Sequence, residues 1–223
     1  MNDIELFFSK TYEDSINQKM LYYKYVFQCE EVKGYVLKIN SIEISDILTY
    51  ITSNQEDVLI SPKDIFQFSS INDATETICR KVKEANNEGY KFLELGKMLL
   101  DDGIIRKDGA YTKYGENHVK TAEMLGLMYE LSHVYFLSCL GCIYNELDEE
   151  NKNKLLVRLV LRNKFVGRLY RASLNGTIDL RNFLYMLSDT TYARRKSNIK
   201  SIINILKNCK EYDFSEFINM VKY

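Results

Sequence analysis

A single proline, Pro62, occurs in this chain of 223 residues, and glycine is also sparse, with 10 in total. Proline and glycine are the residues that most often interrupt helices, so most of the chain can be helical without a break. Hydrophobic residues make up 46% and charged residues 27%, both near the averages of folded globular proteins. The sequence therefore predicts a mainly α-helical protein with small β hairpins, of the α+β type.

Residues 1–70 are predicted to form an α/β region whose role the sequence does not identify. A tyrosine-rich stretch from Ile4 to Phe27 and a second stretch from Ile44 to Thr52 have helical spacing, whereas Gly34 to Asn40 alternates and predicts a strand. Val58 to Ser70 is predicted to form the strand or loop that ends this region.

Residues 71–150 have the element order of a winged-helix module. The predicted helices run from an Asp73 cap to about Asn86, over Phe92–Leu100 and over Tyr114–Gly126. Two extended runs, Leu127–Leu131 and Val134–Ser138, then flank Ser132 and His133 and predict a hairpin. In a winged helix the third helix enters the DNA major groove and the hairpin lies along the backbone.

The two ends of the chain differ strongly in charge, although the net charge is only -1. Residues 151–223 hold 15 Lys and Arg and 5 Asp and Glu, whereas residues 1–150 hold 15 basic and 26 acidic residues. Such asymmetry favours a nucleic-acid or membrane-surface partner for the basic part. Neutralisation of one part by the other across an internal interface is the alternative.

Residues 151–223 are predicted to form a basic module that resembles a helix-turn-helix. The predicted helices are Asp148–Leu161, Phe165–Ser173, Asp179–Leu187 with Thr177 as its cap, and a last long helix over Thr190–Asn208. With residues 71–150, this region gives a tandem arrangement of two DNA-binding modules.

The last predicted helix carries the clearest nucleic-acid signal. Ile199, Ile202 and Leu206 share one face, while Arg194, Ser197 and Ser201 fall on the opposite face. Asn198 and Lys200 flank that exposed face. A guanidinium can bond guanine O6 and N7 together, so Arg194 is the candidate for a base contact. The predicted DNA-binding residues of this helix are Thr190, Thr191, Arg194, Arg195, Lys196, Ser197 and Lys200.

The third helix of the first module offers a second candidate face. Asn117 suits adenine recognition, and Lys113 and Lys120 suit phosphates. The neighbouring carboxylates of Glu116 and Glu123 weaken this face as a binder of a polyanion.

Three stretches together resemble the winged-helix regions of bacterial restriction-modification and related phage-defence proteins. They are Ala110–Leu127, Tyr135–Gly141 and Thr191–Lys200, within a resemblance that spans about residues 72–207. The resemblance implies sequence-directed binding of double-stranded DNA, as a regulator or as the recognition subunit of a restriction or defence complex with partner proteins.

A magnesium-dependent restriction endonuclease with its own recognition modules is the alternative in the enzyme class. Restriction nucleases use an Asp together with an acidic-x-Lys element to hold Mg²⁺ and activate water. Glu31 and Lys33 fit that element beside the strand predicted at Gly34–Asn40, with Asp14 or Asp46 as partners. A non-catalytic protein-protein adaptor, whose acidic part recruits a basic partner, is the third possibility.

Other classes of protein have little support in the sequence. No apolar run is long enough to span a membrane, and the acidic start does not resemble a secretory signal, so we expect a cytoplasmic protein. Cys139 and Cys142 lack a second Cys or His pair at zinc spacing, so no metal site and no resident cofactor are predicted, apart from Mg²⁺ in a nuclease.

Overall fold

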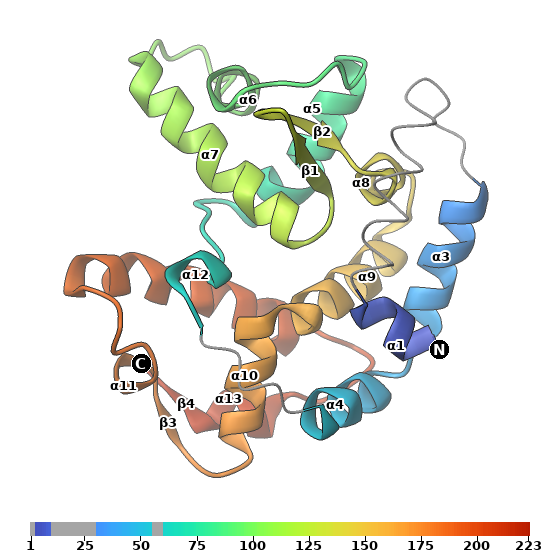
Figure 1. Ribbon diagram of the computed structural model, residues 1–223, viewed down its shortest axis with the longest axis vertical. Coiled ribbons are helices and arrows are strands. Elements are labelled where there is room, and N and C mark those ends of the chain that lie inside the picture. The colour runs from blue at the N-terminus through green and yellow to red at the C-terminus, as the bar shows by residue number, and fades with distance from the viewer. Residues whose placement is uncertain (1–2, 10–29, 55–59) are drawn as a thin grey trace.

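The computed structural model describes residues 3–9, 30–54 and 60–223, and in these ranges the protein is mainly helical (Figure 1). The helices are α1 Asp3–Phe8, α3 Glu30–Ser41, α4 Ile44–Ser53, α5 Ile78–Glu84, α6 Phe92–Leu99, α7 Asp108–Met124, α8 Cys139–Tyr144, α9 Glu149–Arg162, α10 Lys164–Ser173, α11 Leu180–Phe183, α12 Asp189–Lys207 and α13 Ser215–Met220, with a 3-10 turn η1 at Pro62–Asp64 and a π-helical turn η2 at Asp73–Thr77. The strands are β1 Met128–Leu131 and β2 Val134–Leu137, which pair antiparallel, and β3 Ile178–Asp179 and β4 Val221–Lys222, which pair parallel.

The helices gather into two lobes in Figure 1. The hairpin lobe comprises residues 71–137, with α5, α6, α7 and the β1–β2 hairpin. The basal lobe comprises α4 together with residues 149–223, and α9 runs from the side of the hairpin lobe into it. Buried apolar residues of both lobes belong to one continuous core. The basic carboxy-terminal part therefore packs against a described part of the amino-terminal region, through contacts of α9 and α10 with α4.

Within the hairpin lobe, α6 and α7 approach closely because each has a glycine at the contact. A Cβ atom on Gly96 would lie 1.8 Å from the carbonyl oxygen of Tyr111, and one on Gly115 would lie 2.0 Å from that of Phe92. Any side chain at these two positions would push the helices apart. The predicted helix over Phe92–Leu100 is confirmed, and α7 begins six residues before the predicted start at Tyr114.

The predicted hairpin is confirmed. Ser132 and His133 form its turn and both have positive φ, 52° and 64°, as a two-residue turn of type I′ requires. Tyr90, between α5 and α6, makes an additional antiparallel bridge to Tyr135 of β2. The side-chain amide of Asn87 also bonds both backbone groups of Leu137. The strand β2 is therefore held on both sides.

The basal lobe is organised around Arg158 of α9, which is only 2% exposed. Its Nη2 donates to the carbonyl oxygen of Ile42 at 2.8 Å, and its Nη1 donates to Oε2 of Glu211 at 2.6 Å. These bonds join the turn between α3 and α4 to the segment between α12 and α13. Because the guanidinium is buried while the Glu211 side chain remains partly exposed, these bonds keep the buried charge of Arg158 from being left without a partner.

Several predicted elements are wrong in detail. Gly34–Asn40 is not a strand but part of helix α3, because Val36 and Ile39 lie three residues apart and are both buried on one helix face. Of the helix predicted over Ile4–Phe27, α1 covers the start, and residues 10–29 lie outside the described ranges.

Two predicted caps are also replaced. The helix at Asp73 starts earlier, and Ser70 Oγ accepts the Asp73 amide at 3.3 Å. Asp179 rather than Thr177 caps α11, which ends at Phe183 instead of Leu187. In both cases the cap is a nearby residue whose hydroxyl or carboxylate accepts a hydrogen bond from a backbone amide at the start of the helix. The long predicted helix is confirmed as α12, but α13 and β4 follow it.

Among the described helices, none has the length and the apolar character that crossing a membrane requires.

Candidate nucleic-acid interface

α12 is a well-capped helix whose sequence is basic after its first residue. Ser188 Oγ accepts the Thr191 amide, and Asp189 in the first turn pairs with Arg181 at 2.8 Å. From Thr190 to Lys207 the helix has no Asp or Glu and five basic residues. One face of α12 packs against the rest of the basal lobe through the buried side chains of Ile199, Ile202, Ile203 and Leu206. The opposite face is presented to solvent.

The structure places most of the predicted DNA-binding residues of α12 at or near that outer face. Thr190, Arg194, Ser197 and Lys200 are exposed. Ser197 lies between Arg194 and Lys200, which are three residues before and after it and therefore border the same surface. Thr191, Arg195 and Lys196 are only half-buried.

Asn198 is not at the edge of this face, contrary to the sequence prediction. It is buried, and its Nδ2 donates to the carbonyl oxygen of Phe68, 130 residues away in the chain. The sequence analysis also did not include Asn204 and Lys207, which are exposed further along α12. Their positions follow from continuing the helical spacing of the exposed face beyond Ser201.

No carboxylate in the described part of the chain forms an ion pair with the basic residues of α12. These residues are Arg194, Arg195, Lys196, Lys200 and Lys207. Arg195 is half-buried, and no described group accepts a hydrogen bond from its Nε. Burial, and then the charge of neighbouring Arg194, lower the pKa of the Arg195 guanidinium. α12 therefore concentrates positive charge that no described carboxylate neutralises.

Lys200 makes one contact with the end of the chain. Its Nζ lies 4.8 Å from the centroid of the Tyr223 ring, which is a favourable cation–π distance. Burial raises the pKa of Tyr223 to about 12, so the phenol remains protonated at neutral pH. The contact positions the ammonium group without cancelling its charge.

On α7 the predicted lysines do have carboxylate partners. Lys113 pairs with Glu116 at 2.8 Å, and Lys120 pairs with Glu123 at 2.8 Å and with Glu130 of β1 at 3.4 Å. Burial by itself would lower the pKa of the Lys120 ammonium group. Hydrogen bonds to Glu123 and Tyr135 outweigh this effect and raise the pKa.

Asn117, the predicted adenine reader, is also engaged, because its Oδ1 accepts a hydrogen bond from Gln67 Nε2. His118 beside it is completely buried, and its Nε2 lies 3.3 Å from the amide nitrogens of Ser69 and Ser70. Its Nδ1 lies 2.7 Å from the carbonyl oxygen of Tyr114, so a neutral ring with the proton on Nδ1 satisfies every contact. Burial lowers the pKa of His118, opposed in part by that carbonyl.

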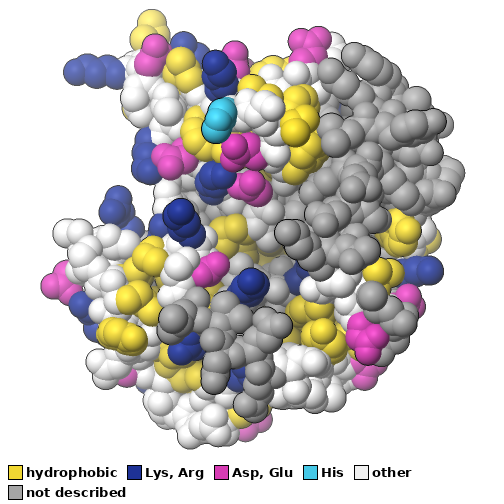
Figure 2. Space-filling view, viewed as in Figure 1, with side chains coloured by type: hydrophobic (Ala, Val, Ile, Leu, Met, Phe, Trp, Pro, Cys, Tyr) yellow, Lys and Arg dark blue, Asp and Glu magenta, His cyan; other side chains and the backbone are white. Residues whose placement is uncertain are grey.

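The segment Gln67–Ser70 therefore joins the two candidate helices. α7 holds it through Asn117, His118 and Thr121, whose Oγ1 donates to the Gln67 carbonyl at 2.8 Å. α12 holds it from the other side through Asn198. Figure 2 shows a notch between the two lobes in this part of the molecule, and Lys and Arg side chains lie on both sides of the notch. Nothing in the sequence indicated this role for residues 67–70.

The β1–β2 hairpin contributes little positive charge. No Lys or Arg occurs between Thr121 and Asn151. The side chain of His133 at the hairpin tip is 96% exposed and lies 3.5 Å from Glu130. Phosphate contacts in nucleic-acid complexes come mostly from Arg, Lys and polar groups, so this hairpin is a poor phosphate binder.

The predicted catalytic element is not beside a strand. Positions 31 and 33 belong to helix α3, where residues two apart are separated by about 200° around the axis. Of the other candidates, Asp46 lies on α4, whereas Asp14 and the side chain of Glu31 lie outside what the structure describes. Within the described ranges, no three His, Cys, Asp or Glu side chains come together as a possible metal site.

Comparisons of the chain with known protein families, curated proteins and solved structures found no match.

Proposed function

We propose that this protein binds double-stranded DNA and that the outer face of α12 makes the main contact. The observation that carries the proposal is the set of five basic side chains on α12 without an ion-pair partner among the described residues. Neutralising DNA phosphates with such side chains releases counterions, and this release supplies most of the sequence-independent affinity for DNA.

The shape of the α12 face also suits close approach to a duplex. Ala193, Ser197 and Ser201 are small and lie between the longer Arg194 and Lys200. A helix with small residues along its exposed face can approach the floor of the major groove, while the longer side chains reach base edges and phosphates. The exposed Thr190 adds a hydroxyl donor near the positive end of the helix, where a phosphate is favoured.

In this proposal the hairpin lobe has a supporting role. Its order of three helices followed by a hairpin, with the Tyr90–Tyr135 bridge at the second edge of β2, is the order of a winged helix. Lys113 and Lys120 of α7 are paired and Asn117 is bonded to Gln67, so we assign to α7 the positioning of the Gln67–Ser70 segment against α12. A regulator, or the recognition subunit of a restriction or defence complex in the cytoplasm, fits this kind of DNA binding.

Binding to a pool of random-sequence duplexes, followed by fluorescence anisotropy at several salt concentrations, tests the proposal. Replacing Arg194 and Lys200 with glutamine removes two charges and keeps long polar side chains on an exposed face. We expect the slope of log affinity against log salt to become shallower by about 0.9 for each lost phosphate contact. A control that removes one positive charge away from α12 is Lys38→Gln, because Lys38 is exposed on α3, and α3 lies at the right of Figure 1, away from the start of α12 at the left.

Equal affinity and equal salt slope in the α12 variant and the wild type would show that α12 does not contact DNA. Circular dichroism of each variant confirms that the helices are intact. Equal losses in the Lys38→Gln control would assign the effect to net charge instead of to α12.

A further inference from the structure

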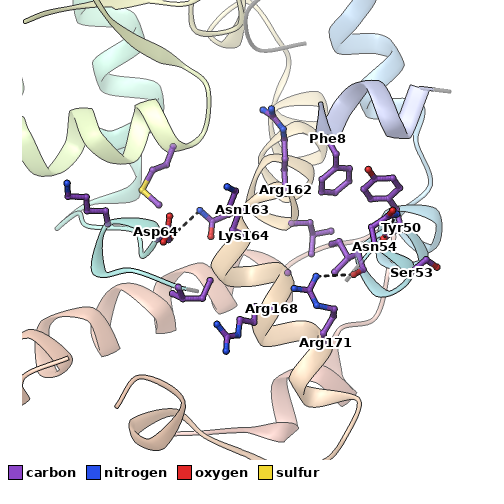
Figure 3. A pocket seen from close by; sticks show the side chains of 16 residues that line it. Phe8, Tyr50, Ser53, Asn54, Asp64, Arg162, Asn163, Lys164, Arg168 and Arg171 are labelled. Carbon is purple, nitrogen blue, oxygen red and sulfur yellow. Dashed lines mark hydrogen bonds between the residues drawn. The ribbon is translucent and has the colours of Figure 1, made fainter. Parts of the chain in front are cut away.

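The turn between α11 and α12 presents two large apolar side chains to solvent. Tyr185 is 77% exposed and Met186 is 38% exposed, and these two residues are called the exposed pair below. Neither of them lines the pocket between α4 and α10 that Figure 3 shows. The exposed pair therefore stands on the outer surface, where a partner molecule can reach it.

The residues on either side of the exposed pair are fixed in place. Leu184 is completely buried and Leu187 nearly so, and both belong to the core. Arg181 bonds both of their carbonyl oxygens, with N–O distances of 3.4 Å to Leu184 and 3.2 Å to Leu187. Arg181 also pairs with Asp189 at 2.8 Å, and its guanidinium lies 5.1 Å from the centroid of the Tyr192 ring. These contacts order the turn before a partner binds, which lowers the entropic cost of a contact there.

The turn offers an apolar contact and not an ionic one. Residues 184–188 include no Lys, Arg, Asp or Glu. The charges of Arg181 and Asp189, on either side of the turn, neutralise each other. A phosphate therefore gains much less here than at Arg194 on the exposed face of α12. Apart from the tyrosine hydroxyl, the exposed pair gains by covering an apolar group of the partner.

The exposed pair lies at the amino end of α12. Met186 is three residues before Asp189, the first residue of the helix, and Figure 1 shows the connection from α11 leading to that end. Thr190 and Arg194 are exposed in the turns that follow. In helix-turn-helix complexes, the amino end of the helix in the major groove contacts base edges. With α12 in the major groove, the exposed pair would lie near the base edges.

The major groove presents one apolar group in ordinary DNA, which is the C5-methyl group of thymine. The modified base 5-methylcytosine carries a methyl group at the same ring position. We propose that the exposed pair packs against pyrimidine 5-methyl groups when α12 docks on a duplex, so that the protein favours DNA that carries them. This inference rests on the duplex binding proposed for α12 and adds a base preference to it.

Three random-sequence duplex pools test the inference by fluorescence anisotropy with the full chain. The thymine pool contains thymine and cytosine, the methyl-free pool contains uracil in place of thymine, and the methylcytosine pool contains uracil and 5-methylcytosine. The pools therefore differ in their 5-methyl groups and keep the same base pairing. Burying one methyl group contributes about fourfold in affinity, so we expect the wild type to bind the thymine pool at least about fourfold more tightly than the methyl-free pool.

The double variant Tyr185→Ala, Met186→Ala should lose this preference. Its salt slope should equal that of the wild type, because neither side chain is charged. Tyr185→Phe should keep the preference, since the ring and not the hydroxyl makes the contact. The matched control is Ile104→Ala, Ile105→Ala, which removes two exposed apolar side chains from the loop between α6 and α7 and should keep the preference.

The outcomes separate this inference from the proposed function. If the wild type binds all three pools equally, with the expected salt slope, the methyl contact is wrong and duplex binding by α12 stands. If it binds none of them, both are wrong. A tighter methylcytosine pool would extend the contact to methylated cytosine, and a preference for that pool alone would name it as the source of the methyl group. If the double variant weakens the thymine and methyl-free pools by the same factor, the exposed pair contacts the DNA without recognising methyl groups, and the inference fails.

Discussion

α7 and α12 are the two longest helices in the described ranges, with 17 and 19 residues, and each presents basic side chains to solvent. On α7, Lys113 and Lys120 each have a glutamate three residues further along the helix, and both pairs have N–O distances of 2.8 Å. On α12, Arg194 and Lys200 flank Ser197 and have no described carboxylate partner.

The number of basic residues on a helix is therefore an incomplete guide to the positive charge that the helix presents. A lysine paired three residues away gains little stability, since such surface pairs contribute about 0.2–0.5 kcal/mol, yet its field is largely cancelled at a distance. α7 also has both of its sides covered, by α6 through Gly115 and by Gln67–Ser70 through His118. We therefore propose that α7 has a structural role and that α12 is the binding element.

The largest expected effect tests whether α7 is structural. In Gly115→Ala the new Cβ would lie 2.0 Å from the Phe92 carbonyl oxygen, so α6 and α7 must separate. We expect the free energy of unfolding to fall by about 3 kcal/mol, as overpacking against backbone predicts. Urea denaturation measures it. Gly109→Ala is the control in the same helix, because nothing lies within 4 Å of its Cβ. Equal stabilities of the two variants would contradict the close packing of α6 on α7.

The second effect concerns the buried histidine that connects α7 to residues 67–70. The pKa of His118 is lowered in the folded state by burial. Its contribution to stability is therefore full above the unfolded pKa of about 6.5 and is lost as pH falls below that value, by at most about 1.4 kcal/mol per pH unit. Denaturation midpoints between pH 8 and 5.5 should show this loss in the wild type.

His118→Gln, which is neutral at every pH, should lose that pH dependence. His133→Gln is the matched control, because the side chain of His133 is 96% exposed. If the wild type and His118→Gln lose stability in parallel on acidification, His118 is not the group responsible.

The third prediction gives the basic residues of α12 a carboxylate three residues away, as the lysines of α7 have. Ser197→Glu places a carboxylate three residues from both Arg194 and Lys200 on the exposed face. We expect duplex affinity to fall about fivefold to tenfold, corresponding to roughly 1 kcal/mol, with little change in stability. Ser197→Gln has nearly the same size and should bind duplex much as the wild type does. A similar loss in both variants would mean that bulk and not charge at Ser197 obstructs binding.

The smallest effect is the reverse experiment on α7. Glu116→Gln together with Glu123→Gln removes the two intrahelical partners of Lys113 and Lys120. Because exposed pairs are weak, we expect stability to change by less than about 0.5 kcal/mol per pair. Duplex affinity measured at low salt should rise no more than about twofold to threefold, as two partly exposed charges predict. A large gain would show that α7 faces the DNA as well.

The sequence by itself determined the features that depend on neighbouring residues. Sparse proline and glycine, the Ser132–His133 turn, and the spacing of Ile199, Ile202 and Leu206 predicted helices, a hairpin and α12 correctly. The sequence also places Glu116 and Glu123 beside the lysines of α7, and the structure pairs them with Lys113 and Lys120. The wrong strand at Gly34–Asn40 arose because a short apolar stretch fits both helical and extended periods.

Only the tertiary structure decided which side chains meet across long separations. Asn117 bonds to a residue 50 positions away and Asn198 to one 130 positions away, so tertiary contacts and not helical position decide what these side chains bind. The stacking of Phe8 on Tyr50, with ring centroids 4.6 Å apart, likewise joins α1 to α4. Helical period, caps and turns follow from local backbone geometry, whereas these contacts follow from how the apolar faces pack into one core, and that packing has no local signature.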